Sequence, residues 1–222
     1  MSALIARQYW ERAHNHEITP ALATALHYLH TATTTVPPRV LPLHTGDRPH
    51  VLLYTDAATD APGLRIGILL VDRQGPALCS TYDVPKTVIE RWRFRTTYIG
   101  QGELLAGPMA LWLHRARLQG RDITWYIDNT SAAAAMIKGS SPQEDSSEMA
   151  LVAALQAATM GCRLWIEWIE SSQNPSDPLS RLGLDDPGVR QHLQEGLWVA
   201  HQPRLKWAEV LQNPEALLQR WE

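Results

Sequence analysis

The chain has few cysteines, no excess of positive charge and no long apolar run, and each shortage excludes a class of protein. Its 222 residues include two cysteines, which are too few for a disulfide scaffold or a four-cysteine zinc site. A formal net charge of −3 excludes a strongly basic nucleic-acid coat, although a local basic face stays open. No apolar run approaches the roughly 20 residues that span a bilayer. We therefore expect a protein without a membrane span that works in a reducing, intracellular setting.

Hydrophobic periodicity divides the chain into three parts. Helical spacing predicts two short helices over 2–15 and 20–32, and a proline-rich connector follows them. The first of these segments is charged near its start, which predicts that it is not a secretory signal. Further helical spacing is present in the tail. These patterns predict an N-terminal helical segment (1–46), a central domain (47–184) and a C-terminal helical extension (185–222).

The central domain alternates between strand-like and helical patterns. Three apolar, turn-bounded runs come first, starting with VLLYTDA, and the third includes ALCSTYD. A helix over 100–120, a strand, two helices and a last strand follow. Pro108 is expected to kink the first of these helices, and Ser141 before Pro142 predicts the start of the longest one. Hairpins followed by helical crossovers predict a mixed sheet with helices packed on it.

Acidic side chains stand where this order would bring strand ends together. Asp56 ends the first strand, Asp128 ends the fourth, Glu103 opens the first long helix, and Asp177 follows the last strand. Ends of neighbouring strands lie about 5 to 10 Å apart. Clustered carboxylates are costly unless cations neutralise them, and an all-oxygen pocket selects Mg²⁺ or Mn²⁺. The pattern is therefore compatible with a two-metal phosphodiesterase site, although an acid of this kind, taken alone, is a solvated surface residue in most proteins.

Four segments, in this order, resemble the ribonuclease H domain of retroelement reverse transcriptases, particularly those of tyrosine-recombinase (DIRS-type) elements. They cover about residues 48–182 and read VLLYTDAATD, IGQGELLAGPMALW, ITWYIDNTSAAAAMIKG and WIEWIESSQNPSDPLSR. The resemblance implies a ribonuclease H-like α/β fold, with a five-stranded mixed sheet in the order 3-2-1-4-5 between helices. It implies that Asp56, Glu103, Asp128 and Asp177 are catalytic and hold two Mg²⁺ ions, with Mn²⁺ as a substitute. The implied activity is cleavage of the RNA strand of an RNA–DNA hybrid, with a polymerase domain or subunit of a reverse transcriptase as partner.

Several polar side chains are candidates for contact with nucleic acid. Arginines alternate with aromatic residues in RWRFR, which predicts a strand or an extended arm with Arg91, Arg93 and Arg95 on one face. That face could bind phosphates, or it could protect the edge of a sheet. The other candidates are Gln101, Asn129 and Lys138. Asn129 could instead cap the following helix.

Two departures from the family pattern keep other functions open. Ile99 and Gly100 stand where many family members have amide side chains that read the minor groove of a hybrid, and recognition of the 2′-hydroxyl is the basis for choosing RNA. The loop before Asp177 lacks the histidine of the cellular enzymes. The alternatives are a weak or inactive nucleic-acid-binding or scaffold domain, and a DNA-cutting nuclease on the same fold.

Overall fold

The structure, a computed structural model, describes residues 48–59, 63–93, 95–205 and 207, together with a few positions between 23 and 33. The helix predicted over 2–15 lies outside these residues, as do most of the helix predicted over 20–32 and nearly all of the tail beyond residue 205. The described positions of the second of these segments, which include Leu26 and Leu29, are helical. In the described part of the chain, every helix is too short or too polar to cross a membrane.

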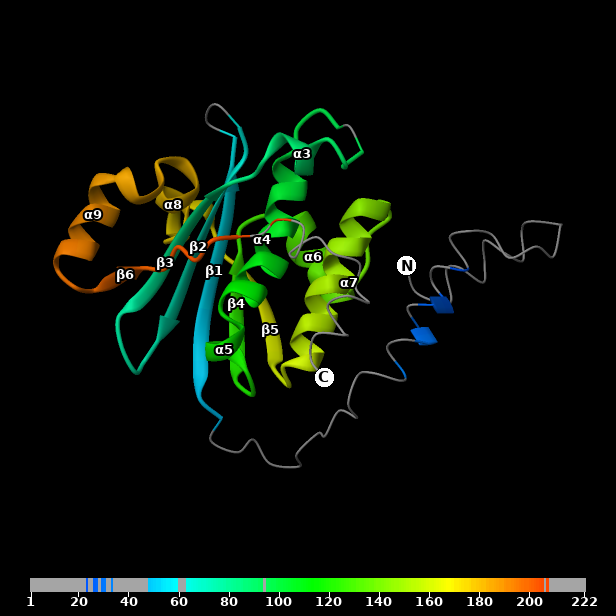
Figure 1. The fold of residues 1–222 in the computed structure, drawn as a ribbon, viewed down its shortest axis with the longest axis horizontal. Helices are drawn as coiled ribbons and strands as arrows, with labels where there is room; N and C mark the ends of the chain where they lie inside the picture. The colour runs from blue at the N-terminus through cyan, green and yellow to red at the C-terminus, as the bar shows by residue number, and fades with distance from the viewer. Residues whose placement is uncertain are drawn as a thin grey trace, which may run out of the picture.

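A six-stranded mixed sheet forms the centre of the protein, in the order β5-β4-β1-β2-β3-β6 (Figure 1). The strands are β1 (His50–Ala58), β2 (Arg65–Asp72), β3 (Ala77–Asp83), β4 (Asp122–Ile127), β5 (Arg163–Trp168) and β6 (Trp198–Ala200). Strands β1, β2 and β3 form an antiparallel meander, whereas β4 lies parallel to β1, β5 parallel to β4, and β6 parallel to β3. The first five strands have the predicted order 3-2-1-4-5. The chain therefore has the ribonuclease H-like α/β fold, with β6 added at one edge.

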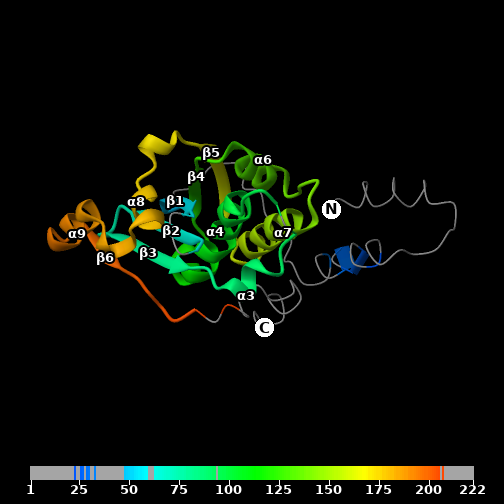
Figure 2. The same cartoon turned by 90° about the horizontal axis from the view of Figure 1, so that it is seen from above.

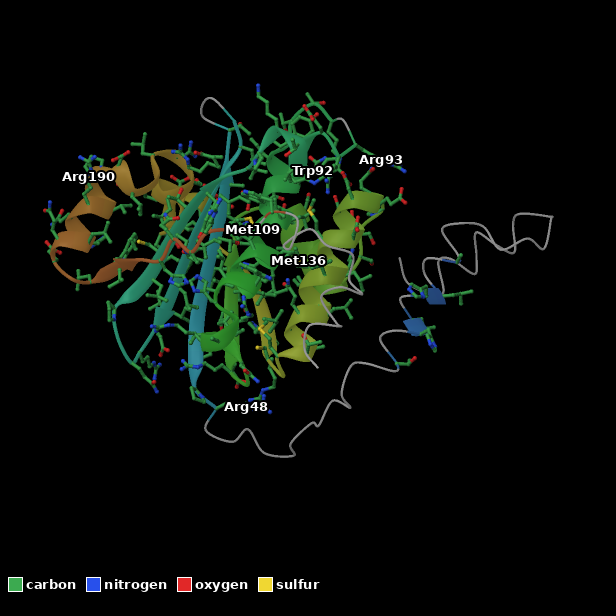
Figure 3. The ribbon with its side chains drawn as sticks, viewed as in Figure 1. Arg48, Trp92, Arg93, Met109, Met136 and Arg190 are labelled. Atoms are coloured by element: carbon green, nitrogen blue, oxygen red, sulfur yellow. The ribbon has the colours of Figure 1, made fainter. Side chains whose placement is uncertain are left out.

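Helices cover the two faces of this sheet unequally, as Figure 2 shows from above. They are α3 (Lys86–Ile89), α4 (Ile99–Leu113), α5 (Arg115–Leu118), α6 (Thr130–Lys138), α7 (Glu144–Thr159), α8 (Asp177–Arg181) and α9 (Pro187–Gln194). Helices α4, α6 and α7 pack with the sheet around the larger hydrophobic core, in which Met109 and Met136 are buried (Figure 3). A smaller core on the other face joins α8 and α9 to β2 and β3, with Leu69 and Leu179 among its members.

Helix α4 lies close to the sheet because a glycine faces the largest buried side chain. The indole of Trp125, on β4, is fully buried and donates a hydrogen bond from Nε1 to Thr55 Oγ1 on β1, 2.9 Å away. A Cβ added to Gly107 would lie 2.0 Å from this indole, at Cη2. The absence of a side chain at Gly107 therefore sets how closely α4 can pack against β1 and β4.

Replacing Gly107 with alanine is expected to destabilise the protein by about 1–3 kcal/mol, because overpacking at the indole outweighs the better helix propensity of alanine. Gly100 is the matched control, since it lies in the same helix and a Cβ there would meet nothing within 4 Å. Gly100→Ala should be neutral or stabilising. Urea denaturation of both variants measures the difference, and equal stability of the two would contradict this view of α4.

Three local predictions for the central domain are wrong. The described residues of RWRFR do not form a strand: Arg91 and Trp92 lie in the turn after α3, and Trp92 is buried in the larger core. The helix predicted over 100–120 is divided at His114 into α4 and α5, although α4 continues past Pro108. Helix α7 begins at Glu144 rather than at Pro142, so Ser141 does not cap it.

The tail of the fold is partly as predicted. Part of the helical spacing predicted for the tail corresponds to α9, which Asp186 caps by accepting hydrogen bonds from the backbone N–H of Gly188 and Val189. Strand β6, which follows α9, was not predicted. Its pairing with β3 makes residues 198–200 part of the central sheet rather than of a purely helical extension.

Candidate metal centre

Two of the predicted acids meet because their strands are parallel neighbours. Thr55 of β1 pairs with Ile127 of β4. The residues that follow them, Asp56 and Asp128, therefore lie side by side where β4 ends. Carboxylate oxygens of Asp56, Glu103 and Asp128 all lie within 4.8 Å of one another. Three of the four predicted acids, which are far apart in the sequence, thus form one cluster.

Glu103 reaches the cluster from the second turn of α4 rather than from its first residue. The glycine before it allows this approach, since a Cβ on Gly102 would lie 2.9 Å from the Cβ of Ala57 on β1. Glu103 Oε1 accepts a hydrogen bond from the backbone N–H of Ala57 at 3.1 Å. Its other oxygen, Oε2, is buried and has no hydrogen-bond partner among the described residues. Glu103 therefore offers a buried acceptor oxygen that receives no hydrogen bond from the described residues.

The electrostatics of the cluster favour a bound cation. Burial, followed by the charges of Asp56 and Asp128, raises the pKa of Glu103 to about 9. Burial also raises the pKa of Asp56 to about 6, and the nearby charges of Asp128 and Asp177 add to this effect. Like charges held this closely do not ionise together unless a cation neutralises them. Three carboxylates, one of which has an oxygen without a partner in the described part of the chain, fit a hard divalent cation, so the cluster could hold one.

Asp177, the fourth predicted acid, lies close to the cluster but outside it. It is the first residue of α8, and both of its carboxylate oxygens accept hydrogen bonds from Arg181 Nε, at 3.0 and 2.9 Å. Its charge contributes to the raised pKa values of Asp56 and Glu103, which places it within electrostatic reach. Its role as a metal ligand stays a prediction.

Two predicted nucleic-acid contacts make hydrogen bonds within the protein. Gln101 is fully buried, and its Nε2 donates to the carbonyl oxygen of Arg93 at 3.1 Å and to Asp145 Oδ2 at 3.2 Å. Asn129 caps α6, because its Oδ1 accepts from the backbone N–H of Ala132 at 3.0 Å. The alternative role weighed for Asn129 is therefore the observed one, and Gln101 does not present its amide to solvent.

Three of the basic candidates are exposed and Arg95 is half-buried, and acidic partners neutralise two of the four. Arg93 and Arg95 form ion pairs with Glu144 and Asp145 at the start of α7; Arg93 is labelled beside that helix in Figure 3. Lys138 is exposed in the last turn of α6, and Arg91 is exposed after α3. Phosphate contact by these four side chains stays a prediction.

Two side chains that contact the acidic residues were not among the predicted site residues. Trp168, at the end of β5, donates a hydrogen bond from Nε1 to the carbonyl oxygen of Asp128 at 2.8 Å, although the residue is 55% exposed. Ser180, in α8, hydrogen-bonds to the carboxylate of Asp56. Nothing in the local pattern of β5 indicated the first contact, whereas Gly67 within β2 was a signal for the second, since an interior glycine often marks a close backbone approach.

Comparison with known proteins found likenesses among solved structures only. No protein-family model matches the chain, and no curated protein matches it. The chain is similar to RNase H1 from the halophilic archaeon Halobacterium salinarum NRC-1, with 19% identity and a TM-score of 0.45 over 63% of this chain and 98% of that one. It is also similar to the N-terminal RNase H domain of a protein from Mycobacterium tuberculosis, with 15% identity and a TM-score of 0.43 over 65% of this chain and 99% of that one. Strand order and pairing, rather than these likenesses, identify the ribonuclease H-like fold. The three clustered acids of this chain could hold a divalent cation.

Proposed function

We propose that the protein is a Mg²⁺-dependent ribonuclease H, an endonuclease that hydrolyses the RNA strand of RNA–DNA hybrids. The observation that carries this proposal is the convergence of Asp56, Glu103 and Asp128 beside the adjacent strands β1 and β4, with a buried oxygen on Glu103 that has no hydrogen-bond partner among the described residues. The order of the sequence segments that resemble reverse-transcriptase ribonuclease H domains supports it. On the same grounds we propose that the domain works with the polymerase domain or subunit of a retroelement-like reverse transcriptase.

In this proposal Asp56, Glu103 and Asp128 hold the metal ions, and Asp177 completes the set. Two bound Mg²⁺ ions, or Mn²⁺ in their place, would activate water and stabilise the leaving oxygen. The protein holds the acids in position before substrate binds. The backbone N–H of Ala57 fixes one oxygen of Glu103, and the indole of Trp168 holds the carbonyl oxygen of Asp128. Ligands held by such partners keep their geometry when charge develops in the reaction.

A nuclease that cuts DNA on the same fold is the second candidate, and a specific observation favours it. Ile99 and Gly100 have no side-chain amide, and the amide of Gln101 is buried. The start of α4 therefore presents none of the amide groups that would read a 2′-hydroxyl beside Glu103. The scaffold alternative receives less support, because an acid cluster this costly to bury serves no purpose in a protein that only binds.

A cleavage assay on three labelled duplexes separates these functions. We expect Mg²⁺ or Mn²⁺ to support cutting of the RNA strand of an RNA–DNA hybrid, and a chelator to abolish it. Double-stranded RNA and double-stranded DNA should stay intact under the same conditions. Cutting of the DNA duplex would support the second candidate, and binding without cleavage at every metal concentration would support a scaffold.

A further inference from the structure

Ser180 contacts both Asp56, in the acid cluster, and the backbone of Asp177, the predicted acid outside it. It lies in α8 and is 1% exposed, and its hydroxyl is within hydrogen-bond distance of both Asp56 Oδ2 and the carbonyl oxygen of Asp177. A serine hydroxyl has a single proton to donate. A charged acceptor forms the stronger hydrogen bond. The Ser180 hydroxyl therefore donates its hydrogen bond to the carboxylate of Asp56, rather than to the carbonyl oxygen of Asp177, whenever that carboxylate is ionised. The hydroxyl therefore holds one oxygen of Asp56 from the side opposite to α4.

A glycine in β2 makes this contact possible. Gly67 is the direct partner of Asp56 in the antiparallel pairing of β1 with β2. A Cβ added there would lie 2.6 Å from both the carbonyl oxygen of Ser176 and the backbone nitrogen of Ser180. Backbone atoms cannot move aside as a flexible side chain can, so any larger residue would push α8 away from the sheet. Gly67 thus sets α8 in register with Asp56.

Other contacts hold α8 in place independently of the Ser180 hydroxyl. Thr81 of β3 donates a hydrogen bond from Oγ1 to the carbonyl oxygen of Leu179 at 2.8 Å. Asn174, just before α8, donates from Nδ2 to the carbonyl oxygen of Thr55 at 3.1 Å. Leu179 itself is fully buried in the smaller core. Removal of the Ser180 hydroxyl should therefore leave the helix docked.

We infer that Ser180 is a positioning residue: its hydroxyl fixes the orientation of the Asp56 carboxylate so that the other oxygen, Oδ1, stays available to a divalent cation. The inference rests on the proposed function, because it assigns Ser180 a role at the same metal site. A carboxylate with one oxygen held loses less freedom on binding a cation, and partners of metal ligands contribute to affinity in this way. Ser180 itself touches neither the cation nor the substrate.

The test compares Ser180→Ala with Thr81→Val. Ser180→Ala removes a hydroxyl of α8 that contacts Asp56. Thr81→Val removes a hydroxyl of β3 that contacts α8 but no acidic side chain. Calorimetric titration with Mg²⁺, without substrate, should show a dissociation constant raised about 10-fold or more in Ser180→Ala, as is typical for partners of metal ligands. Thr81→Val should keep the wild-type value. At saturating Mg²⁺ the KM for the hybrid should be the same in all three proteins.

The outcomes separate this inference from the proposed function. Wild-type Mg²⁺ affinity in Ser180→Ala would overturn the positioning role while cleavage by the wild-type protein still supports the nuclease. An equal loss of affinity in Thr81→Val would also overturn it, because docking of α8 would then be the cause. If Ser180→Ala does not fold, Ser180→Cys decides in its place, since the thiol has a similar size but is a weak donor. A wild-type protein that neither binds Mg²⁺ nor cleaves would overturn the nuclease and the inference together.

Discussion

Replacement of Asp128 with asparagine is expected to lower Mg²⁺-dependent cleavage of an RNA–DNA hybrid by more than about 100-fold, because loss of a metal ligand exceeds the 10- to 100-fold effect typical of its partners. Asparagine keeps the shape of the side chain but removes the negative charge that attracts the cation. The hydrogen bond from Trp168 goes to the backbone of residue 128 and therefore survives the change. Single-turnover cleavage rates at saturating protein measure the effect on the reaction.

Asp122→Asn is the matched control, because Asp122 lies at the opposite end of β4 and forms an ion pair with Arg163. It should keep the cleavage rate of the wild-type protein. Thermal melts should show that Asp128→Asn folds as well as the wild type, since Asp128 is less buried than the other two acids. A fully active, folded Asp128→Asn would exclude the metal-centre role of this cluster.

Replacement of Glu103 with glutamine is expected to abolish cleavage and also to stabilise the metal-free protein at alkaline pH. Burial raises the pKa of Glu103 to about 9 in the folded protein, well above its ordinary value. Between those two values the folded protein binds more protons than the unfolded chain, so the free energy of unfolding falls as pH rises. Glutamine has no proton to lose. We therefore expect Glu103→Gln to be about 2 to 4 kcal/mol more stable than the wild type at pH 8, and about as stable near pH 4.

Urea denaturation in chelator at these two pH values measures the difference. Glu90→Gln, which changes an exposed carboxylate at the end of α3, is the control and should follow the wild type at both. Added Mg²⁺ should stabilise the wild-type protein but not Glu103→Gln, because a ligand stabilises only the state that binds it. If the wild-type protein and Glu103→Gln showed the same pH dependence of stability, Glu103 would not be the buried acid described here.

The sequence was most informative near the ends of strands, although only Asp128 directly follows its strand; β1 continues past Asp56 to Ala58. Asp56 and Asp128 follow apolar runs that are strongly β-forming, and parallel neighbours place their ends together by geometry alone. The order of strands and helices then restricted the sheet to few topologies, one of which the family resemblance selected. The position of Glu103 was predicted less well, because the start of α4 at Ile99 has no side-chain cap to mark it.

The sequence was least informative where contacts between distant residues decide the structure. The alternation in RWRFR is typical of a strand, but Trp92 is buried in the larger core after α3, and Arg93 and Arg95 form ion pairs with α7 from outside any strand. Gln101 was expected to face nucleic acid, and only the fold shows that its amide is used by Asp145. The contact of Ser180 with Asp56 joins residues 124 positions apart; Gly67 signals a close backbone approach, but the local pattern does not show that Ser180 makes it.

The pairing of β6 with β3 has a consequence for self-association. The ribonuclease H-like order alone would leave the outer hydrogen-bonding groups of β3 open, as a template on which another chain could align. Residues 198–203 cover this outer side of β3 instead. Strand β6 pairs with β3, and beyond β6 the carbonyl oxygens of His201 and Pro203 accept hydrogen bonds from Ser80 and Tyr82. A chain cut after residue 184 would keep the acids and the five main strands but expose the outer side of β3. An exposed edge strand of this kind is a template for edge-to-edge aggregation.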